Sequence, residues 1–365
     1  MSEWQTFCLK DLGKIVGGTT PSTNNPKNYG NKIAWITPKD LSTLQGRYIK
    51  KGSRSISRLG FKSCSCVLLP KHAILFSSRA PIGYVAIAKK RLCTNQGFKS
   101  IIPNKKIYFE FLYYLLKYHK DNISNIGGGT TFKEVSGATL GLFKVKIPPT
   151  YYEQQKIART LSILDQKIEN NHKINELLHN LAYKIYEYYF KYKPKNAKLE
   201  QIIIENPKSN IMVKNAQKTQ DKYPFFTSGD NILSYPKAII DGRNCFLNTG
   251  GNAGIKFYVG KASYSTDTWC ICANEFSDYL YLLLSSIKTH INQSFFQGTS
   301  LKHLQKNLLK KYPIYMPSVH EIKKFNQIIM PLLTLISINT RTSKKLEQIR
   351  DFLLPLLLKQ QVKPQ

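Results

Sequence analysis

The sequence predicts an α+β protein in which two similar mixed α/β domains are joined by two long antiparallel coiled-coil helices, giving a pseudo-two-fold internal repeat. Three observations predict this fold class. A heptad pattern runs from Pro148 to Pro194, the pattern recurs 168 residues later, and the segments that precede its two copies also match. A period of this length indicates the duplication of a whole domain rather than a solenoid of short repeats.

The first helical stretch has apolar or pairing residues at alternating steps of four and three, which is the spacing of a coiled-coil seam. These positions are Ile157, Leu161, Leu164, Ile168, Asn171, Asn175, Leu178, Ala182, Ile185 and Tyr189. Prolines can begin or end such a helix but are not expected inside it, so Pro148 and Pro194 bound the stretch. At about 1.5 Å per residue, the helix would be roughly 60 Å long.

The second helical stretch aligns with the first without a gap. A shift of 168 positions places Pro149 on Pro317 and Ile157 on Phe325. Before the helices, the segment 74–98 matches the segment 245–269. We therefore expect a globular domain at 1–150, a helix at 151–194, a second globular domain at 195–316 and a second helix at 317–365.

Each globular domain is expected to consist of short strands followed by a helix. In the first domain we expect a strand or short helix within 7–16, loops at 17–21, 45–62 and 77–83, strands at 33–37, 66–70, 73–76, 84–88 and 98–102, and a helix at 109–120. In the second domain we expect strands at 223–227, 245–248, 255–259 and 268–272, and a helix at 278–291.

The net charge of +32 is concentrated on the globular domains. Residues 1–150 carry 24 Lys and Arg against 6 Asp and Glu, and residues 195–316 carry 15 against 8. Such domains favour a polyanionic partner, and nucleic acid fits a duplicated globule better than ribosomal partners or anionic lipid. Seven scattered cysteines favour a reducing cytosol, and we expect no signal peptide and no membrane span.

Motifs for catalysis or cofactor binding are absent from the sequence. There is no phosphate-binding loop, and the only Pro-Pro pair, Pro148-Pro149, lacks the context of an amino-methyltransferase motif. Asp165-x-Lys167 and Glu321-x-Lys323 have a nuclease-like spacing, but they lie on the predicted helices without a second acid, so solvated helix charges explain them better.

Metal and nucleotide sites are not expected either. The pairs Cys64/Cys66 and Cys270/Cys272 are spaced too closely for a zinc knuckle and fit alternate positions on strands. The glycine-rich segment 250–254 matches no dinucleotide fingerprint and is expected to be a tight turn. We therefore expect no catalytic, cofactor or metal site in this chain.

Nearly the whole chain resembles the specificity subunit of type I restriction–modification systems. The motifs that carry the resemblance are Trp35-Ile36-Thr37 with Asp40-Leu41, the segments 77–83, 94–98 and 128–132, and Ile147-Pro148-Pro149 with Glu153-Gln154. The second copy departs from the pattern, because Met316-Pro317 replaces Pro-Pro and His320-Glu321-Ile322 replaces the Glu-Gln motif.

The resemblance implies a non-catalytic, cytoplasmic subunit. Each globular domain would be a target recognition domain that reads one half of a bipartite site in double-stranded DNA. The two helices would be spacers that separate the half-sites by a fixed length and dock two methyltransferase (modification) subunits, and restriction subunits through them. S-adenosylmethionine and ATP would belong to those partner subunits.

An antiparallel pair of helices that meet at their midpoints would form five seam layers. We expect Asn171 to approach Asn339 within hydrogen-bonding distance, which would fix the register; independent solvent-facing Asn residues are the alternative. The remaining layers would be Ile157 with Leu353, Leu164 with Leu346, Leu178 with Leu332, and Ile185 with Phe325.

Polar and basic residues of the predicted loops are the candidates for DNA contacts. They are Thr19, Thr20, Arg47, Arg54, Arg58, Ser78, Arg79, Asn95, Gln96, Thr130, Thr131, Thr249, Asn252, Thr266, Asp267, Thr299 and Ser300. Several of them recur in both domains, as expected of residues that maintain the fold rather than read the DNA sequence. The polar and basic loop 45–62 is an equally good candidate for DNA contacts.

Three other functions remain open from the sequence alone. The chain could be a DNA methyltransferase or nuclease component with an unrecognised site, a non-DNA assembly scaffold, or the specificity subunit of a fused or type II-like system. Methyl transfer by the isolated chain would identify the first, and the absence of salt-dependent DNA binding would identify the second.

Overall fold

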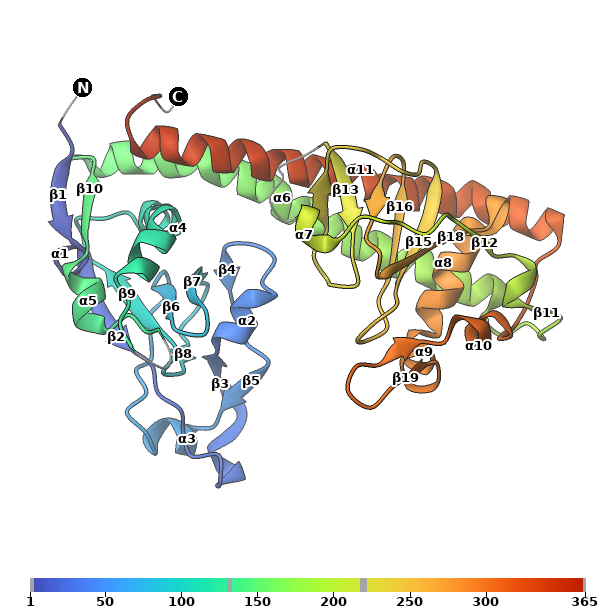
Figure 1. Ribbon diagram of the computed structural model, residues 1–365. Coiled ribbons are helices and arrows are strands. Elements are labelled where there is room, and N and C mark those ends of the chain that lie inside the picture. The colour runs from blue at the N-terminus through green and yellow to red at the C-terminus, as the bar shows by residue number, and fades with distance from the viewer. Residues whose placement is uncertain (1–2, 130–132, 217–221, 364–365) are drawn as a thin grey trace. The chain divides into compact units, whose positions relative to one another are not determined.

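The computed structural model describes residues 3–129, 133–216 and 222–363, and the chain forms two compact units (Figure 1). Unit 1 comprises Met1–Glu169 and Leu346–Gln365, and unit 2 comprises Asn170–Lys345. Two long helices, α6 (Tyr151–Tyr186) and α11 (Val319–Leu358), continue from one unit into the other. Each unit therefore contains a globular part and a portion of both long helices.

The described strands of unit 1 form three sheets. The largest has the order β2 (Gly13–Gly17), β9 (Lys99–Pro103), β6 (Ile74–Ser78), β7 (Ile82–Ala88) and β4 (Tyr48–Ile49). A second sheet has the order β5 (Arg54–Ile56), β3 (Tyr29–Ile36) and β8 (Cys93–Thr94), and the third pairs β1 (Gln5–Cys8) with β10 (Lys144–Ile147). Only the pairs β4–β7 and β3–β8 are parallel among these described strands.

The main core of unit 1 lies around helix α4 (Phe109–Asn125), which buries Phe111, Leu112 and Leu116. This core also includes Ile157 of α6 and Leu357 of α11, so both long helices belong to it. Burial of one such side chain contributes roughly 1.5–3 kcal/mol. The remaining helices of the unit are α1 (Leu9–Leu12), η1 (Pro26–Asn28), α2 (Pro38–Ser42), α3 (Arg58–Lys62) and α5 (Gly137–Leu142).

Unit 2 repeats the sheets of unit 1. Its largest sheet has the order β12 (Ile204–Glu205), β18 (Thr268–Cys272), β15 (Arg243–Asn248) and β16 (Ile255–Val259). The second has the order β14 (Leu233–Tyr235), β13 (Tyr223–Phe226) and β17 (Ser263–Tyr264). Two short pairs join β11 (Ala197–Lys198) to β21 (Pro313–Ile314), and β19 (Phe296–Gln297) to β20 (His303–Leu304).

The core of unit 2 is built around α8 (Ser277–Ser286), and it includes Tyr186 of α6 and Phe325 of α11. Shorter helical segments complete the unit. They are the π-helical turn η2 (Glu187–Lys191), η3 (Leu199–Gln201), α7 (Val213–Ala216), η4 (Asn274–Phe276), α9 (Lys288–Ser294) and α10 (Lys306–Lys310).

The shared strand order confirms the predicted duplication. The pairs β6–β9, β6–β7 and β3–β8 have the same partners and directions as β15–β18, β15–β16 and β13–β17. Within the described residues, β4 has no counterpart in unit 2, and the β19–β20 pair corresponds in unit 1 to a single antiparallel bridge between Gly128 and Glu134. The α+β class with two similar domains and two long helices is therefore confirmed.

Both long helices begin with side-chain caps. The Thr150 hydroxyl accepts the Glu153 N–H at 3.2 Å before α6. At α11, the Ser318 hydroxyl accepts the Glu321 N–H at 3.3 Å, and the Glu321 carboxylate accepts the Ser318 N–H at 2.9 Å. This reciprocal pair is a capping box, which satisfies backbone donors that the first helical turn leaves free.

Helix α11 runs through Pro331 and Pro355, so the expectation that proline interrupts these helices is wrong for the second one. An interior proline costs about 3 kcal/mol or more because it removes one hydrogen bond and crowds the preceding turn. On either side of Pro331, Ile329 and Leu333 are almost fully buried. Two such side chains contribute roughly 3–6 kcal/mol together, which offsets this cost.

The register between α6 and α11 differs from the predicted one by four residues. The Asn339 side-chain amide donates to the Asn175 side-chain oxygen at 2.9 Å, and the Asn171 amide donates to the Ser343 hydroxyl at 3.2 Å. The predicted layer of Asn171 with Asn339, and the four layers counted from it, are therefore wrong by about one helical turn. The Asn175 amide also lies 3.4 Å from the Thr340 hydroxyl, which supports the observed register.

The predicted seam residues themselves face the interior. Ile157 and Phe325 are buried. The other eight are half-buried: Leu164, Asn171, Leu178, Ile185, Leu332, Asn339, Leu346 and Leu353. The predicted seam residues are therefore all at least half-buried, although the predicted partners across the seam are wrong.

Replacing Asn175 and Asn339 together by leucine is expected to raise the melting temperature by about 2–4 °C, as for a gain of roughly 1 kcal/mol. The reason is that a half-buried polar pair is exchanged for apolar contact across the helices. Calorimetry of the double variant and of N339L alone is the measurement. N339L should gain less, because Asn175 loses its partner, and a lower melting temperature for the double variant would contradict the pairing.

Most predicted strands and helices of the globular domains are present, with four differences. Residues 66–70 form no strand apart from an isolated bridge between Leu69 and Leu92. Cys64 lies in the turn that follows α3, and Cys66 lies just after this turn, so neither is on a strand. Cys270 and Cys272 do lie on β18, as expected. The expected helix at 278–291 is divided at Ile287 into α8 and α9, and the expected loop 45–62 contains β4, β5 and α3.

Candidate nucleic-acid interface

Unit 1 exposes a group of cations on one segment of chain between β3 and β6. Residues 38–62 contain seven Lys and Arg but only one acidic residue, Asp40. Six of the seven cations are exposed and are called the basic segment below: Lys39, Lys50, Lys51, Arg54, Arg58 and Lys62. Exposed cations without neighbouring acids are suited to contact phosphates.

The fold holds this segment in place through Asp40 and Tyr29. The Asp40 carboxylate accepts the N–H groups of Thr37 and Ser53, each at 2.7 Å. Burial opposes ionisation of Asp40, but the hydrogen bonds from Ser53 and Thr37 outweigh it and lower the pKa of this carboxyl. The Arg54 guanidinium lies 4.3 Å from the centre of the Tyr29 ring, which orients it by a cation–π contact.

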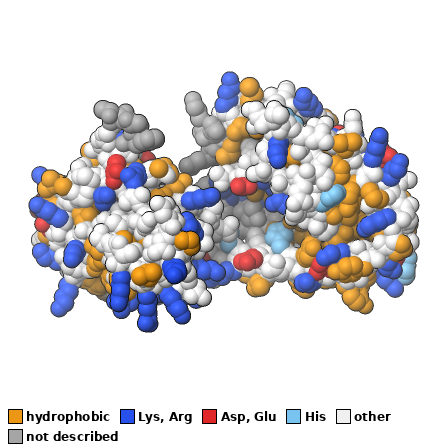
Figure 2. Space-filling view, turned by 90° about the horizontal axis from the view of Figure 1, so that it is seen from below, with side chains coloured by type: hydrophobic (Ala, Val, Ile, Leu, Met, Phe, Trp, Pro, Cys, Tyr) orange, Lys and Arg blue, Asp and Glu red, His pale blue; other side chains and the backbone are white. Residues whose placement is uncertain are grey.

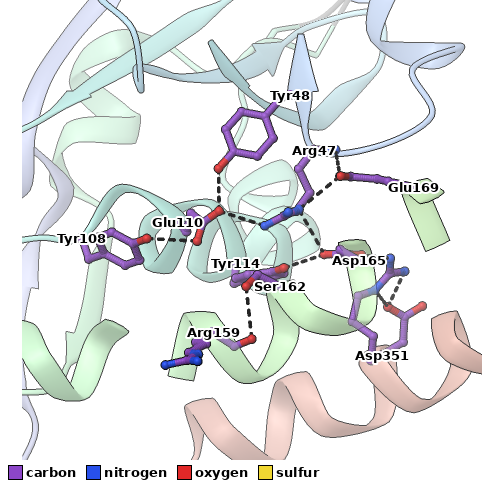
Figure 3. A network of polar contacts seen from close by, with 11 residues as sticks. Arg47, Tyr48, Tyr108, Glu110, Tyr114, Arg159, Ser162, Asp165, Glu169 and Asp351 are labelled. Atoms are coloured by element: carbon purple, nitrogen blue, oxygen red, sulfur yellow. Dashed lines mark hydrogen bonds and ion pairs between the residues drawn. The ribbon is translucent and has the colours of Figure 1, made fainter. Parts of the chain in front are cut away.

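Arg47, the seventh cation, is not available to DNA, so its prediction as a DNA contact is wrong. Its side chain is only 3 % exposed. Figure 3 shows it among three carboxylates: Nη1 lies 2.9 Å from Glu110, and Nε lies 3.2 Å from Glu169 and 3.9 Å from Asp165. Arg47 therefore attaches the turn before β4 to helices α4 and α6.

The same buried network continues to α11. Asp165 accepts a hydrogen bond from the Tyr114 hydroxyl at 2.5 Å and from Arg350 at 2.7 Å. Burial, followed by the negative charge of Asp165, raises the pKa of Tyr114. Asp165 and Glu321 are the two acids with nuclease-like spacing, and both are used within the fold, Asp165 here and Glu321 in the cap of α11.

The other candidates of unit 1 meet where three loops converge. The Thr20 hydroxyl donates to the Gln96 side chain, which is exposed. The Asn95 side chain accepts the Gly97 N–H at 3.0 Å, Thr19 is bonded through its N–H to Thr94, and Ser78 is fully buried. Arg79 is about one-third exposed and pairs with Glu134 at 3.4 Å. Thr130 and Thr131 lie outside the described residues.

Unit 2 contains a similar junction. The Thr249 hydroxyl and N–H both donate to the Asp267 carbonyl oxygen, at 2.7 and 3.2 Å. The exposed Asp267 carboxylate accepts a hydrogen bond from Ser265, and Thr266 is bonded through its N–H to Ile211 at 3.0 Å. The candidates Asn252, Thr299 and Ser300 are exposed and lie outside this junction of hydrogen bonds.

The repeated hydrogen bonds indicate what the junction residues do. In unit 1 the Ser78 N–H donates to Gly97 and the Asn95 N–H to Ile36; in unit 2 the Thr249 N–H donates to Asp267 and the Ser265 N–H to Phe226. The same loops are thus tied together in both units. Junction residues with these backbone roles maintain the fold. This favours the interpretation that the polar residues recurring in both domains are fold residues rather than residues that read the DNA sequence.

Charge on the surface is predominantly positive. In Figure 2, Lys and Arg side chains are spread over the visible face, whereas Asp and Glu are few. Several cations of unit 2 are engaged: Lys256 donates to the Thr227 carbonyl at 2.9 Å, and burial lowers its pKa. Lys306 lies 5.1 Å from the centre of the Trp269 ring.

Within residues 3–129, 133–216 and 222–363, no cluster of three or more His, Cys, Asp or Glu side chains is arranged to hold a metal ion. In the same part of the chain, no helix has the length and apolar character that crossing a membrane would require.

Comparison with known proteins identifies the family. The family described as "Type I restriction modification DNA specificity domain" matches residues 1–180 and 195–348. The chain belongs to this family. The two matched segments correspond to the two copies of the internal repeat, and family members are the DNA-recognition component rather than the catalytic one.

Individual relatives agree with this assignment. The type I restriction enzyme MjaIX specificity subunit of Methanocaldococcus jannaschii is 32% identical over 98% of this chain and 93% of its own length. The putative MjaX specificity subunit of the same organism is 39% identical over 47% of this chain and 38% of its own length. A crystal structure of the type I S subunit from M. genitalium has the same fold, with a TM-score of 0.62 and 18% identity over 98% of this chain and 96% of that one.

Sequence reasoning missed two features of this surface. Lys39 was not among the candidates, although it adjoins Asp40 in a motif of the family resemblance. Lys50, Lys51 and Lys62 lay in the segment named as an equally good candidate, but only the structure shows that these three are exposed while Arg47 is buried. Nothing local in the sequence distinguishes Arg47 from its neighbours.

Proposed function

We propose that this chain is the specificity subunit of a type I restriction–modification complex and that each unit binds one half of a bipartite DNA site. The observation that carries the proposal is the double match to the DNA specificity domain family, one match in each copy of the repeat. A net charge of +32, concentrated on the globular parts, supports a polyanionic partner.

In unit 1 we assign phosphate binding to the basic segment. Its six cations are exposed, and the one acid in the same stretch is held by hydrogen bonds within the fold. Phosphate contacts give affinity without sequence preference, so bases must be read by other exposed polar groups. Gln96 of unit 1 and Asn252, Thr299 and Ser300 of unit 2 are our candidates, because they are exposed and their side chains can hydrogen-bond base edges.

Methyltransferase subunits are the proposed partners of the long helices. In unit 2, Ile174, Leu177 and Leu181 of α6 are 43 %, 69 % and 49 % exposed, a larger apolar face than a solvated helix normally leaves open. In this proposal the partner subunits bind S-adenosylmethionine and ATP and connect the chain to restriction subunits. The complex would act in the cytoplasm, where the DNA is.

Because the chain crosses between its units only within α6 and α11, we also propose that the length of these helices sets the spacer between the half-sites. We assign the target recognition domains to 1–150 and 195–316 and the spacer helices to 151–194 and 317–365. The MjaIX specificity subunit supports this arrangement as a relative that covers both repeats.

Replacing Lys50, Lys51, Arg54 and Arg58 by alanine is expected to weaken binding to duplex DNA of any sequence and to flatten its salt dependence. If all four contact phosphates, the slope of log K against log salt should fall by about 3–4. The measurement is fluorescence anisotropy with random-sequence and target duplexes, using the chain with its methyltransferase subunits.

The matched control replaces four exposed helix cations, Lys167, Lys173, Lys323 and Lys324, by alanine. This control carries the same change in net charge but should retain the slope of the parent. Equal slopes for the two quadruple variants would contradict the assignment of the basic segment. The target sequence itself is found by sequencing the methylome of host cells with and without the chain.

A further inference from the structure

Three of the seven cysteines lie together beside the basic segment of unit 1. Cys64 and Cys66 follow helix α3, and Cys93 lies on β8. The Cys64 and Cys66 sulfur atoms are 3.1 Å apart. Cys66 and Cys93 are buried in a small cluster with Trp35 and Ile56, whereas Cys64 is half-buried at its edge.

The environment activates one of these sulfur atoms. A hydrogen bond from the Cys93 thiol lowers the pKa of Cys66 to about 5, and the same interaction raises the pKa of Cys93. The Cys64 thiol donates towards Cys66, and burial followed by this hydrogen bond raises the pKa of Cys64. Thiolates rather than thiols are the nucleophiles that small oxidants attack, so Cys66 is the reactive sulfur and Cys64 its neighbouring thiol.

The backbone allows these two residues to be joined. Residues two apart on a strand are about 6.6 Å apart between Cα atoms, close to the upper limit of about 6.8 Å for a disulfide. Residues 63–65 form a turn instead, which shortens this distance. The sulfur atoms would then need to approach by about 1 Å to reach the S–S bond length.

We propose that Cys64 and Cys66 form an oxidation-sensitive dithiol, which hydrogen peroxide converts to a disulfide. The Cys66 thiolate attacks one peroxide oxygen, the O–O bond breaks, and the departing hydroxide takes a proton to give water and a Cys66 sulfenic acid. The Cys64 sulfur then loses its proton and attacks the Cys66 sulfur, expelling a second water. Two thiols lose two electrons in total, and one peroxide is reduced to two waters.

Oxidation would disturb the surface that we assign to DNA, a consequence that rests on the proposed function. The Cys64 thiol lies 3.3 Å from the Gly60 carbonyl of α3, and the Cys66 sulfur lies 3.3 Å from the Thr19 carbonyl. Disulfide formation removes the one S–H of Cys64, which can then donate neither to Gly60 nor to Cys66, and joining the two sulfur atoms displaces Cys66 from its place beside Thr19. Gly60 packs so closely that an added Cβ would lie 2.0 Å from the Asn28 carbonyl oxygen, which leaves α3 little room to adapt. Because α3 cannot absorb the change locally, we expect the whole helix to be displaced, and Arg58 at its first position with it.

The chemistry is tested by peptide mass spectrometry of the wild-type chain, without reduction, after treatment with hydrogen peroxide. Trypsin releases Cys64 and Cys66 in one peptide, residues 63–71, and Cys93 in another, residues 92–99. The expected result is a 63–71 peptide that is lighter by two hydrogen atoms and returns to its original mass with dithiothreitol. A 63–71 peptide of unchanged mass, or one linked to 92–99, would overturn the proposal.

The consequence is tested with the chain in its methyltransferase complex. Oxidation should weaken binding to duplex DNA by about three- to tenfold, as for the loss of one or two phosphate contacts, and dithiothreitol should restore it. C64S should resist this change, whereas C8S, which removes another half-buried cysteine, should not. Equal losses in wild type and C64S would overturn the switch. A reduced complex that fails to bind DNA would instead count against the proposed function, and the peptide masses would still test the dithiol.

Discussion

Replacing Arg47 by methionine is expected to lower the unfolding free energy of unit 1 by about 3–5 kcal/mol. The substitution removes the cation that pairs with Glu110 and Glu169 in a site where the Arg47 side chain is only 3 % exposed. Asp165 keeps its ion pair with Arg350. An unpaired buried charge costs far more than the pair contributed, because the interior solvates it poorly. Methionine retains much of the apolar stem, so the loss reports mainly on charge.

Arg54 is the matched control because it is exposed and has no ion pair among the described contacts. R54M should change the unfolding free energy by less than about 0.5 kcal/mol, the usual range for surface positions. Urea unfolding measures both variants, and hydrogen exchange followed by peptide mass spectrometry assigns the loss to unit 1. If R47M weakened DNA binding but kept the stability of the parent, Arg47 would be a phosphate contact after all.

The fold class was predictable because both of its signals are periodic. A heptad seam and a repeat at 168 residues survive as patterns along the chain, and each corresponds to a feature of the structure: helices α6 and α11, and the sheets that recur in units 1 and 2. Short buried strands such as β6 and β15 were predictable for a different reason: a run of apolar residues bounded by turns is a local signal that the sequence shows directly.

The helix register was not predictable from the seam alone. Sliding two antiparallel heptad helices by four residues again brings apolar positions opposite apolar positions, so the pattern permits both registers. The polar groups decide between them: Asn175 bonds with Asn339, and Asn171 with Ser343. Ser343 was not assigned to the seam, and this omission placed Asn171 opposite the wrong partner.

The roles of individual cations were the least predictable feature. Arg47 and Arg54 lie in the same basic stretch, yet one is buried among acids and the other is exposed. The acids that capture Arg47 are Glu110, Asp165 and Glu169, which are distant in sequence. Side-chain partners across such separations depend on the folded packing, and no local pattern encodes them. For the same reason, exposure rather than residue type selects the remaining candidates for DNA contacts.

Arg243 is expected to be as important to unit 2 as Arg47 is to unit 1. Its Nε atom donates to Asp278 at 2.6 Å, and Nη1 donates to Thr334 at 3.0 Å, so it joins β15 and α8 to α11. Asp278 is 1% exposed. R243M should therefore lower the unfolding free energy of unit 2 by about 3–5 kcal/mol, because it leaves the Asp278 carboxylate buried without a counter-charge.

The pH dependence of this loss distinguishes charge from packing. Burial raises the pKa of Asp278, and the hydrogen bonds and charge of Arg243 oppose that rise, so R243M should raise this pKa further. A carboxyl whose pKa is higher in the folded state than in the unfolded chain favours folding when protonated. Its contribution is complete below the unfolded pKa of about 3.9 and is lost as pH rises through the folded pKa.

The difference in unfolding free energy between wild type and R243M should consequently shrink as the pH is lowered from 7.5 to 5. The matched control is R243M/D278N, which keeps the shape of the site but has no carboxyl group to titrate there. At pH 7.5 its loss of unfolding free energy relative to wild type should be smaller than that of R243M, and this loss should change less between the two pH values. Urea unfolding at the two pH values measures all three proteins. A loss in R243M that is the same at both pH values would mean that the stem of Arg243, rather than its charge on Asp278, holds unit 2 to α11.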